Sequence, residues 1–97
     1  MSYLNIVNVL NQFYRNNVTD MSCMFYGCSL LKELNLSNFN TNNVITMDGI
    51  FNGCSSLKEL DLSNFNTNNV IDMSYMFNGC LDELKEKIKK QNININI

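Results

Sequence analysis

Hydrophobic and polar positions repeat along the chain with a period of 26 residues. Residues 18–43 and 44–69 align without a gap and are identical at 18 of 26 positions. A third copy begins at residue 70 and departs from the pattern after Cys80. Repetition of this kind is typical of stacked supersecondary units, none of which buries its apolar side alone. We therefore expect a degenerate first repeat at 1–17, a repeat array at 18–80 (units 18–43, 44–69 and a partial unit 70–80), and a different C-terminal end.

One half of each unit has the pattern of a short strand. The sequence L-x-x-L-x-L occupies residues 31–36 and 57–62, and a related segment lies at 4–9. Apolar and polar residues alternate at the end of each segment, as they do in a half-buried strand. The pattern predicts three short parallel strands at 4–9, 31–36 and 57–62. The leucines expected to face the core are Leu34, Leu36, Leu60 and Leu62.

The other half of each unit has helical spacing. Met21, Met24, Phe25 and Cys28 stand at positions i, i+3, i+4 and i+7, and the next two units repeat this spacing. A polar residue precedes each stripe and a glycine ends it, as at the two ends of a short helix. Short helices are predicted at 21–27, 47–53 and 73–79. The core columns they contribute are Phe25, Phe51, Phe77, Cys28, Cys54 and Cys80.

Asparagine-rich segments connect the two halves, at residues 40–43 and 66–69. Asparagine favours turns because its side chain bonds the nearby backbone and because it tolerates left-handed conformations. The predicted fold class is an α/β repeat solenoid. It is a variant leucine-rich repeat with one short parallel strand and one short helix per 26-residue turn, closed by a C-terminal helix.

The segment after Cys80 breaks the repeat. Leu81, Leu84 and Ile88 share one helical face, and Glu83–Lys87 and Glu86–Lys90 are i,i+4 pairs in the favourable order. We expect residues 81–91 to form a helix that caps the solenoid; a short membrane-surface or partner-binding helix is the alternative. Residues 92–97 form a low-complexity tail, expected to fray or to pair at a sheet edge.

Composition and charge remove several function classes. The chain has 97 residues, no His, Pro or Trp, and a formal net charge of −2. Without histidine, the commonest general base and metal ligand is missing, and no Gly-rich phosphate loop is present. We therefore expect no enzyme and no cofactor. A slightly acidic chain whose single arginine is Arg15 is not expected to bind nucleic acid. No apolar run is long enough for a transmembrane segment, and no signal peptide is visible.

The cysteine column is the most tempting site for chemistry. Cys28, Cys54 and Cys80 recur every 26 residues, so stacking would place them in a line about 5 Å apart. A line of three thiolates does not match tetrahedral zinc coordination, although Cys23 offers a fourth ligand. A Cys28–Cys54 disulfide is a second alternative. The favoured interpretation is a stack of small buried thiols.

The repeat motif resembles a known family. The sequence N-x-N-N-V-x-x-M-x-x-[MI]-F-x-G-C-S-x-L-K-E-L-[ND]-L-S-N-F-N-T is similar to that of the BspA-like leucine-rich-repeat surface proteins. Their repeat is also that of a domain of unknown function in mycoplasma lipoproteins. The resemblance covers residues 4–80. It implies a solenoid of ~26-residue turns and a cell-surface or secreted location. It also implies membership of families in host-associated bacteria and protists that are often proposed as adhesins.

One polar stripe is the candidate interaction face. Its side chains point away from the inward leucines, and in leucine-rich repeats the open sheet surface carries most partner contacts. A merely solvated face is the alternative. The predicted function is a non-enzymatic protein-interaction or adhesin-type module for a protein or glycan ligand, as a monomer or with weak end-to-end association. The alternative is an intracellular repeat scaffold or a fragment of a larger repeat protein without separate activity. The face consists of Lys32, Glu33, Asn35, Lys58, Glu59 and Asp61.

Overall fold

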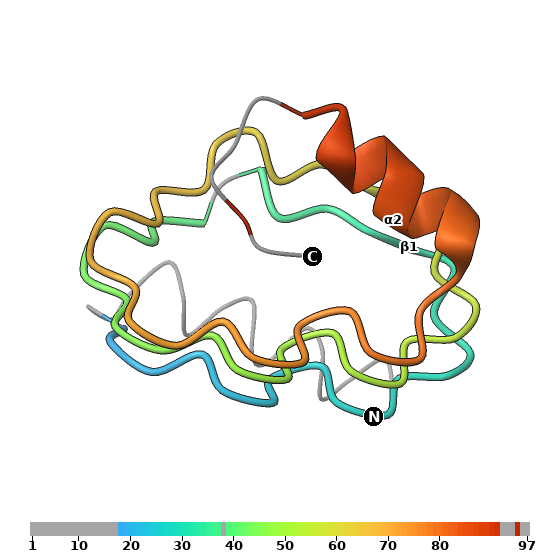
Figure 1. Ribbon diagram of the computed structural model, residues 1–97, viewed down its shortest axis with the longest axis horizontal. Helices are drawn as coiled ribbons and strands as arrows, with labels where there is room; N and C mark the ends of the chain where they lie inside the picture. Colours follow the sequence, from blue (N-terminus) through green and yellow to red (C-terminus); the bar gives the residue numbers. More distant parts are fainter. Residues whose placement is uncertain (1–17, 38, 92–94, 96–97) are drawn as a thin grey trace.

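The computed structural model describes residues 18–37, 39–91 and 95. In chain order its regular elements are strand β1 at Glu33–Leu34, strand β2 at Glu59–Leu60 and helix α2 at Asp82–Lys89. The chain winds around a flattened ring, so that successive units lie side by side (Figure 1). One long side is formed by residues 18–30, 44–56 and 70–80, here called the turn half. The opposite side, residues 31–37, 39–43 and 57–69, is called the strand half.

The strands are shorter than predicted. β1 and β2 pair in parallel with Glu33 opposite Glu59 and Leu34 opposite Leu60, a register of one 26-residue unit. Both strands end early because the next polar side chain bonds the backbone locally: the Asn35 Oδ1 atom accepts a hydrogen bond from the Ser37 N–H at 2.9 Å. Such an Asx turn offers the backbone an alternative to the ladder. The strand predicted at 4–9 lies outside the described residues, as does the repeat predicted at 1–17.

The segments predicted as helices at 21–27, 47–53 and 73–79 are chains of turns instead. In the first two segments, alternate N–H groups donate to the next unit and are unavailable for bonds to the carbonyl four residues back. The N–H groups of Met21, Cys23, Phe25 and Gly27 donate to the carbonyls of Thr46, Asp48, Ile50 and Asn52 at 2.8–2.9 Å. The intervening N–H groups of residues 24, 26 and 28 bond three residues back.

The second and third units are joined in the same way. The N–H groups of Met47, Gly49, Phe51 and Gly53 donate to the carbonyls of Asp72, Ser74, Met76 and Asn78 at 2.8–3.0 Å. A residue with positive φ stands in the middle of each chain of turns: Cys23 at 54°, Gly49 at 63° and Tyr75 at 59°. This left-handed residue is incompatible with a continuous α-helix. The helical spacing of apolar residues therefore arises from a run of tight turns that keeps one side inward.

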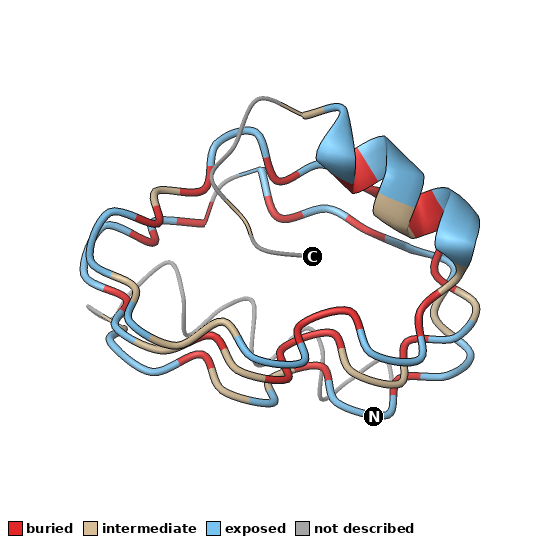
Figure 2. Ribbon diagram, in the orientation of Figure 1, coloured by how far each residue is buried: buried red, intermediate tan, exposed pale blue. Residues whose placement is uncertain are grey.

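The core lies between the two halves (Figure 2). All ten residues assigned to core columns from the sequence are buried, with Phe25, Phe51, Cys54 and Leu62 completely inaccessible. The phenylalanine rings stack along the array, with centroids 5.8 Å apart between Phe25 and Phe51 and 5.4 Å between Phe51 and Phe77. Aromatic contacts of this kind stabilise a fold by about 0.5–1.5 kcal/mol beyond the area they bury.

The asparagine-rich corners are bonded from unit to unit. The Asn66 Nδ2 atom donates to Asn42 Oδ1 at 3.1 Å, and Asn69 Nδ2 donates to the Asn42 carbonyl at 2.9 Å. Thr41 is buried, and its hydroxyl accepts from the Asn66 N–H and donates to the Asn66 carbonyl. Amide and hydroxyl side chains thus satisfy backbone groups at the corners, where no strand ladder exists.

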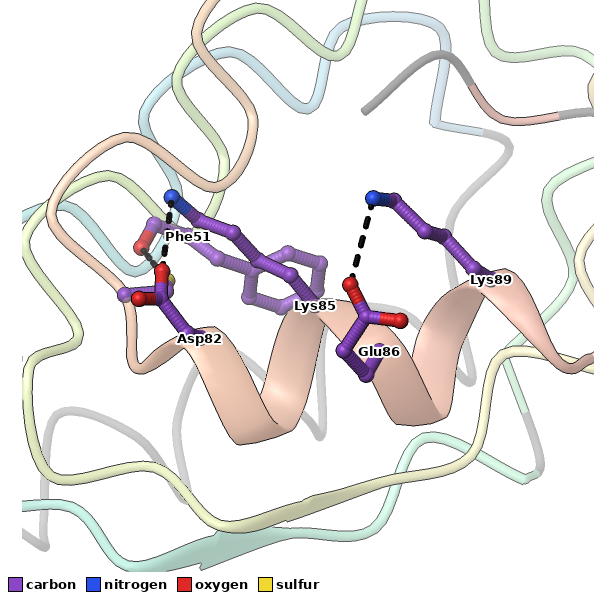
Figure 3. A network of polar contacts seen from close by, with 6 residues as sticks. Phe51, Asp82, Lys85, Glu86 and Lys89 are labelled. Carbon is purple, nitrogen blue, oxygen red and sulfur yellow. Dashed lines mark hydrogen bonds and ion pairs between the residues drawn. The ribbon is translucent and has the colours of Figure 1, made fainter.

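Helix α2 packs on the strand half with Leu84 and Ile88 buried. The structure has α2 at Asp82–Lys89, which is slightly shorter than the helix predicted at 81–91. The predicted Glu83–Lys87 and Glu86–Lys90 pairs do not form. Ion pairs instead join Lys85 to Asp82 at 4.0 Å and Lys89 to Glu86 at 3.3 Å (Figure 3). Of the predicted tail, only Ile95 is described, and it packs partly buried against the core.

Candidate functional site

The six residues of the candidate interaction face are all exposed. β1 and β2 position them, since Leu34 and Leu60 point into the core and their neighbours point out. The parallel register sets Glu33 beside Glu59. A hydrogen bond from the Lys58 N–H to the Lys32 carbonyl, at 2.8 Å, extends the pairing by one residue. The face therefore carries like residues side by side. Three of the six, Asn35, Asp61 and Glu59, also have local structural roles.

Asn35 and Asp61 end their strands. The Asp61 Oδ1 atom accepts from the Ser63 N–H at 2.9 Å, as Asn35 does from Ser37 in the preceding unit. Hydrogen bonds from the Ser63 side chain and backbone lower the pKa of Asp61 below its usual value. A carboxylate held ionised in this way is a weak base, so its chemistry is that of a turn-forming acceptor.

Glu59 is partnered by Lys87 of helix α2. Lys87 Nζ lies 2.8 Å from Glu59 Oε1 and also donates to the Lys58 carbonyl at 3.1 Å. The hydrogen bond to Glu59 is the main cause of the raised pKa of Lys87. Both side chains are about half exposed or more, so this pair positions α2 but adds little stability. Among the described residues, no hydrogen bond or ion pair engages the side chains of Lys32, Glu33 and Lys58.

The cysteine column is a ladder of buried thiols. The Cys54 thiol donates to the Phe25 carbonyl and the Cys80 thiol to the Phe51 carbonyl, both with sulfur–oxygen distances of 3.2 Å. Burial raises the pKa of Cys54 to about 12, with a smaller contribution from Cys28 and Cys80. Burial also raises the pKa of Cys80. These thiols are poor nucleophiles and poor metal ligands, because both roles need the thiolate.

All four cysteines are free thiols, so the Cys28–Cys54 disulfide alternative is wrong. Cys23 is exposed and lies apart from the buried column. Within residues 18–37, 39–91 and 95, no group of three or more His, Cys, Asp or Glu side chains is placed to hold a metal ion. The zinc alternative therefore has no geometric support in that part of the chain.

A polar cluster that the sequence did not single out lies on the turn half. The Asp48 Oδ1 atom accepts from Ser22 Oγ at 2.6 Å, across the junction of two units, and from Thr46 Oγ1 at 2.9 Å. These two bonds, with Ser22 first, lower the pKa of Asp48. Asp20 accepts from the Ser22 N–H at 2.8 Å, and Ser22 is likewise the main cause of its lowered pKa.

The sequence contained a signal for this cluster. The first and third units place Asp and Ser at positions 20 and 22 and at 72 and 74, whereas the second unit has Thr46 and Asp48. In the middle unit the carboxylate thus stands two residues later in the repeat, and a threonine takes the position that Asp20 and Asp72 hold in the other units. The exchange keeps like charges from standing directly side by side in adjacent units, which would destabilise the pairing. It also gives Asp48 two hydroxyl donors.

Comparison with known proteins places the chain in a family. The family model described as a Mycoplasma protein of unknown function, DUF285, matches residues 2–96. No curated protein and no solved structure gives a significant match. In the described part of the chain, none of the helices is long and apolar enough to span a lipid bilayer. The match extends over almost the whole sequence, and the chain therefore belongs to the DUF285 family of Mycoplasma proteins of unknown function.

Proposed function

We propose that the chain is a non-enzymatic interaction module of a surface protein, built as a leucine-rich-repeat-type solenoid of the BspA-like kind. Its ligand is a protein or a glycan, bound through the face formed by Lys32, Glu33, Asn35, Lys58, Glu59 and Asp61. The hydrogen bonds between backbone groups one unit apart support the solenoid part of the proposal. The resemblance of the repeat motif to that of BspA-like surface proteins supports the surface-protein part.

The observation that carries the proposal is the pairing of like charges on β1 and β2. Glu33 stands directly opposite Glu59 in the parallel register, and Lys32 precedes one as Lys58 precedes the other. Like charges opposite one another in a sheet destabilise it. Within the described residues the only compensation is Lys87 at Glu59, which leaves Glu33 and both lysines for a ligand with complementary charge.

Binding to immobilised ligands tests this proposal. The purified chain is applied to an array of glycans and extracellular-matrix proteins, next to a Lys32→Glu/Lys58→Glu variant and a Lys89→Glu/Lys90→Glu control. The two variants make the same change in net charge. The control changes Lys89, which ends α2 and already pairs with Glu86, and Lys90, which follows the helix. We expect the face variant to lose at least tenfold in binding to any ligand that the wild type retains, and the control to keep it.

Two results would count against the proposal. Equal loss in both variants would show that overall charge, rather than this face, governs binding. Failure of the wild type to bind any array component, together with no labelling of the tagged chain by surface biotinylation of intact cells, would remove the surface-module role.

A further inference from the structure

The turn half ends in a row of N–H groups that have no hydrogen-bond acceptor among the described residues. In the first and second units, four alternate N–H groups donate to the next unit. Their equivalents in the third unit are the N–H groups of Met73, Tyr75, Phe77 and Gly79, which donate to no acceptor within the described residues. We call these four groups the donor edge. It has the spacing and direction of the two rows of bonds already formed inside the chain.

The opposite end of the turn half carries the matching acceptors. The carbonyls that receive bonds in the second and third units belong to residues 46, 48, 50 and 52 and to 72, 74, 76 and 78. The equivalent carbonyls of the first unit, those of Asp20, Ser22, Met24 and Tyr26, accept no hydrogen bond in the described part of the molecule. We call these four groups the acceptor edge.

Exposure distinguishes both edges from the middle unit. Gly49 is buried and Asn52 and Gly53 are partly buried, because a unit covers them on each side. Their equivalents at the acceptor edge, Cys23, Tyr26 and Gly27, are all exposed. At the donor edge Tyr75, Asn78 and Gly79 are exposed as well, with Tyr75 at 74%. The two edges therefore each present an exposed tyrosine and an exposed glycine at opposite ends of the described array, while Phe25 and Phe77 stay buried in the core.

Gly27, Gly53 and Gly79 occupy equivalent positions in the three units and form a glycine column. The spacing within this column shows that the edges can approach closely. A Cβ atom on Gly53 would lie 3.3 Å from Gly27 Cα, and one on Gly79 would lie 3.5 Å from Gly53 Cα. A Cβ atom on Gly27 would meet nothing within 4 Å. The space at Gly27 is the space that a preceding glycine would fill. Gly79, at the donor edge, is such a glycine.

We propose that the donor edge binds the acceptor edge of a second copy of this chain. The N–H groups of residues 73, 75, 77 and 79 then donate to the partner's carbonyls at 20, 22, 24 and 26, in the register used twice within the chain. Such a contact is heterologous, since each copy keeps one free edge of each kind, and it builds open chains instead of closed dimers. It is independent of the proposed ligand face, which lies on the strand half.

Helix α2 limits the contact to the turn half. It covers the strand half at the C-terminal end (Figure 1), where a further strand would otherwise stack. Two copies therefore meet along their turn halves and diverge on the strand side. A contact of four backbone bonds and little buried area is weak and is best detected by trapping it.

A disulfide provides the trap. Tyr75 is replaced by cysteine, a residue that the equivalent position 23 already holds at nearly the same φ, 54° against 59°. Across the proposed joint, Tyr75→Cys would face Cys23 of the next copy at about one strand spacing, ~5 Å, which a disulfide can span. Within one chain the two positions are separated by a whole unit, about 10 Å, which is too far.

With diamide as oxidant, we expect Tyr75→Cys to give a ladder of multiples of 11.2 kDa on non-reducing gels. The ladder should vanish in Tyr75→Cys/Cys23→Ser. Ser63→Cys, which places a thiol at another exposed position, on the strand half, should crosslink at least tenfold less at equal concentration. In wild type, sedimentation velocity should show association that rises with concentration, and Tyr75→Asp should abolish it by setting a carboxylate against the acceptor edge.

Three results would overturn the proposal. A dimer that persists without Cys23 would mean that two donor edges pair symmetrically. Equal crosslinking of Ser63→Cys would mean random collision. A monomeric wild type at all concentrations, together with no ladder from folded Tyr75→Cys, would mean that the edges do not meet.

Discussion

The strand half and the turn half end differently at the C-terminal side of the array. On the strand half, side chains following the last strand replace the next unit: Gln91 Oε1 accepts from the Leu62 N–H and Gln91 Nε2 donates to the Leu60 carbonyl, both at 2.8 Å. The side-chain amide of Gln91 thus makes the two hydrogen bonds that a peptide group of a neighbouring strand would make. In a similar way, Lys87 Nζ donates a hydrogen bond to the Lys58 carbonyl. On the turn half, the equivalent N–H groups have no such substitute among the described residues.

The difference between the two halves indicates which of them supplies most of the contacts between adjacent units. Each junction of the turn half contains five backbone hydrogen bonds, a stacked phenylalanine pair and a thiol–carbonyl bond. The strand half contributes strands of two residues each and relies on α2 for its closure. We therefore expect the stability of the contacts between units to depend mainly on the turn half. We expect the stability of the strand half to depend on its contacts with α2 and Gln91. The predictions below test this division.

The largest expected effect is that of removing the middle ring of the stack. Phe51→Ala leaves a cavity flanked by Phe25 and Phe77 and should lower the free energy of unfolding by about 3–5 kcal/mol. The matched variant is Phe65→Ala, which removes the same ring from the strand half, where Phe65 is 7% exposed. We expect the smaller loss there. Urea denaturation followed by circular dichroism measures both; a larger loss for Phe65→Ala would reverse the division.

The glycine column gives a second comparison, within the turn half. Gly53→Ala and Gly27→Ala share the strain of a side chain at positive φ, 81° and 73° respectively. Only Gly53→Ala also sets a methyl group 3.3 Å from backbone of the neighbouring unit. It should therefore destabilise by about 1–3 kcal/mol more than Gly27→Ala, the usual range for overpacking. Equal losses in urea denaturation would show that strain alone matters and that close stacking of the units does not.

The cap of the strand half is tested at Gln91. Gln91→Met keeps the length of the side chain and removes both bonds to β2 and its extension, which should cost about 1–2 kcal/mol. Lys90→Met is the control, because Lys90 is exposed on the neighbouring position and its side chain has no partner among the described residues. Hydrogen exchange at the Leu62 N–H should accelerate in Gln91→Met alone. Unchanged exchange would show that the Gln91 amide does not replace a strand.

The sequence was sufficient for the period and the core but not for the local backbone. Repetition at 26 residues fixed which positions stack, so Leu34, Phe51 and Cys54 could be assigned to buried columns. The run of turns at 21–27 could not be distinguished from a helix, because both place apolar residues three and four apart on one side. What decides between them is the partner of each N–H group, and that partner lies in another unit.

Two site features were missed for related reasons. Gln91 stands outside the repeat, and its role depends on where α2 leaves it relative to β2. Asp48 lies within the repeat, but its partner Ser22 is 26 residues away, and the exchange of Thr and Asp between columns gains meaning only once the units are stacked. The charged face was assigned from alternation alone, which predicts exposure but not that Lys87 reaches Glu59.

The smallest expected effect is a pH dependence that separates bonds between units from bonds within one. The pKa values of Asp48 and Asp61 are both lowered in the folded chain, by Ser22 of another unit and by the neighbouring Ser63 respectively. Because the folded pKa is the lower one, the stabilisation is complete above the unfolded value of about 3.9 and is lost as the pH falls through the folded pKa. Denaturation midpoints between pH 6 and 2.5 should therefore fall less steeply in Asp48→Asn than in wild type. Asp61→Asn should flatten the curve less, since its bond closes only a local turn; an equal or greater flattening would show that the contact across units adds nothing.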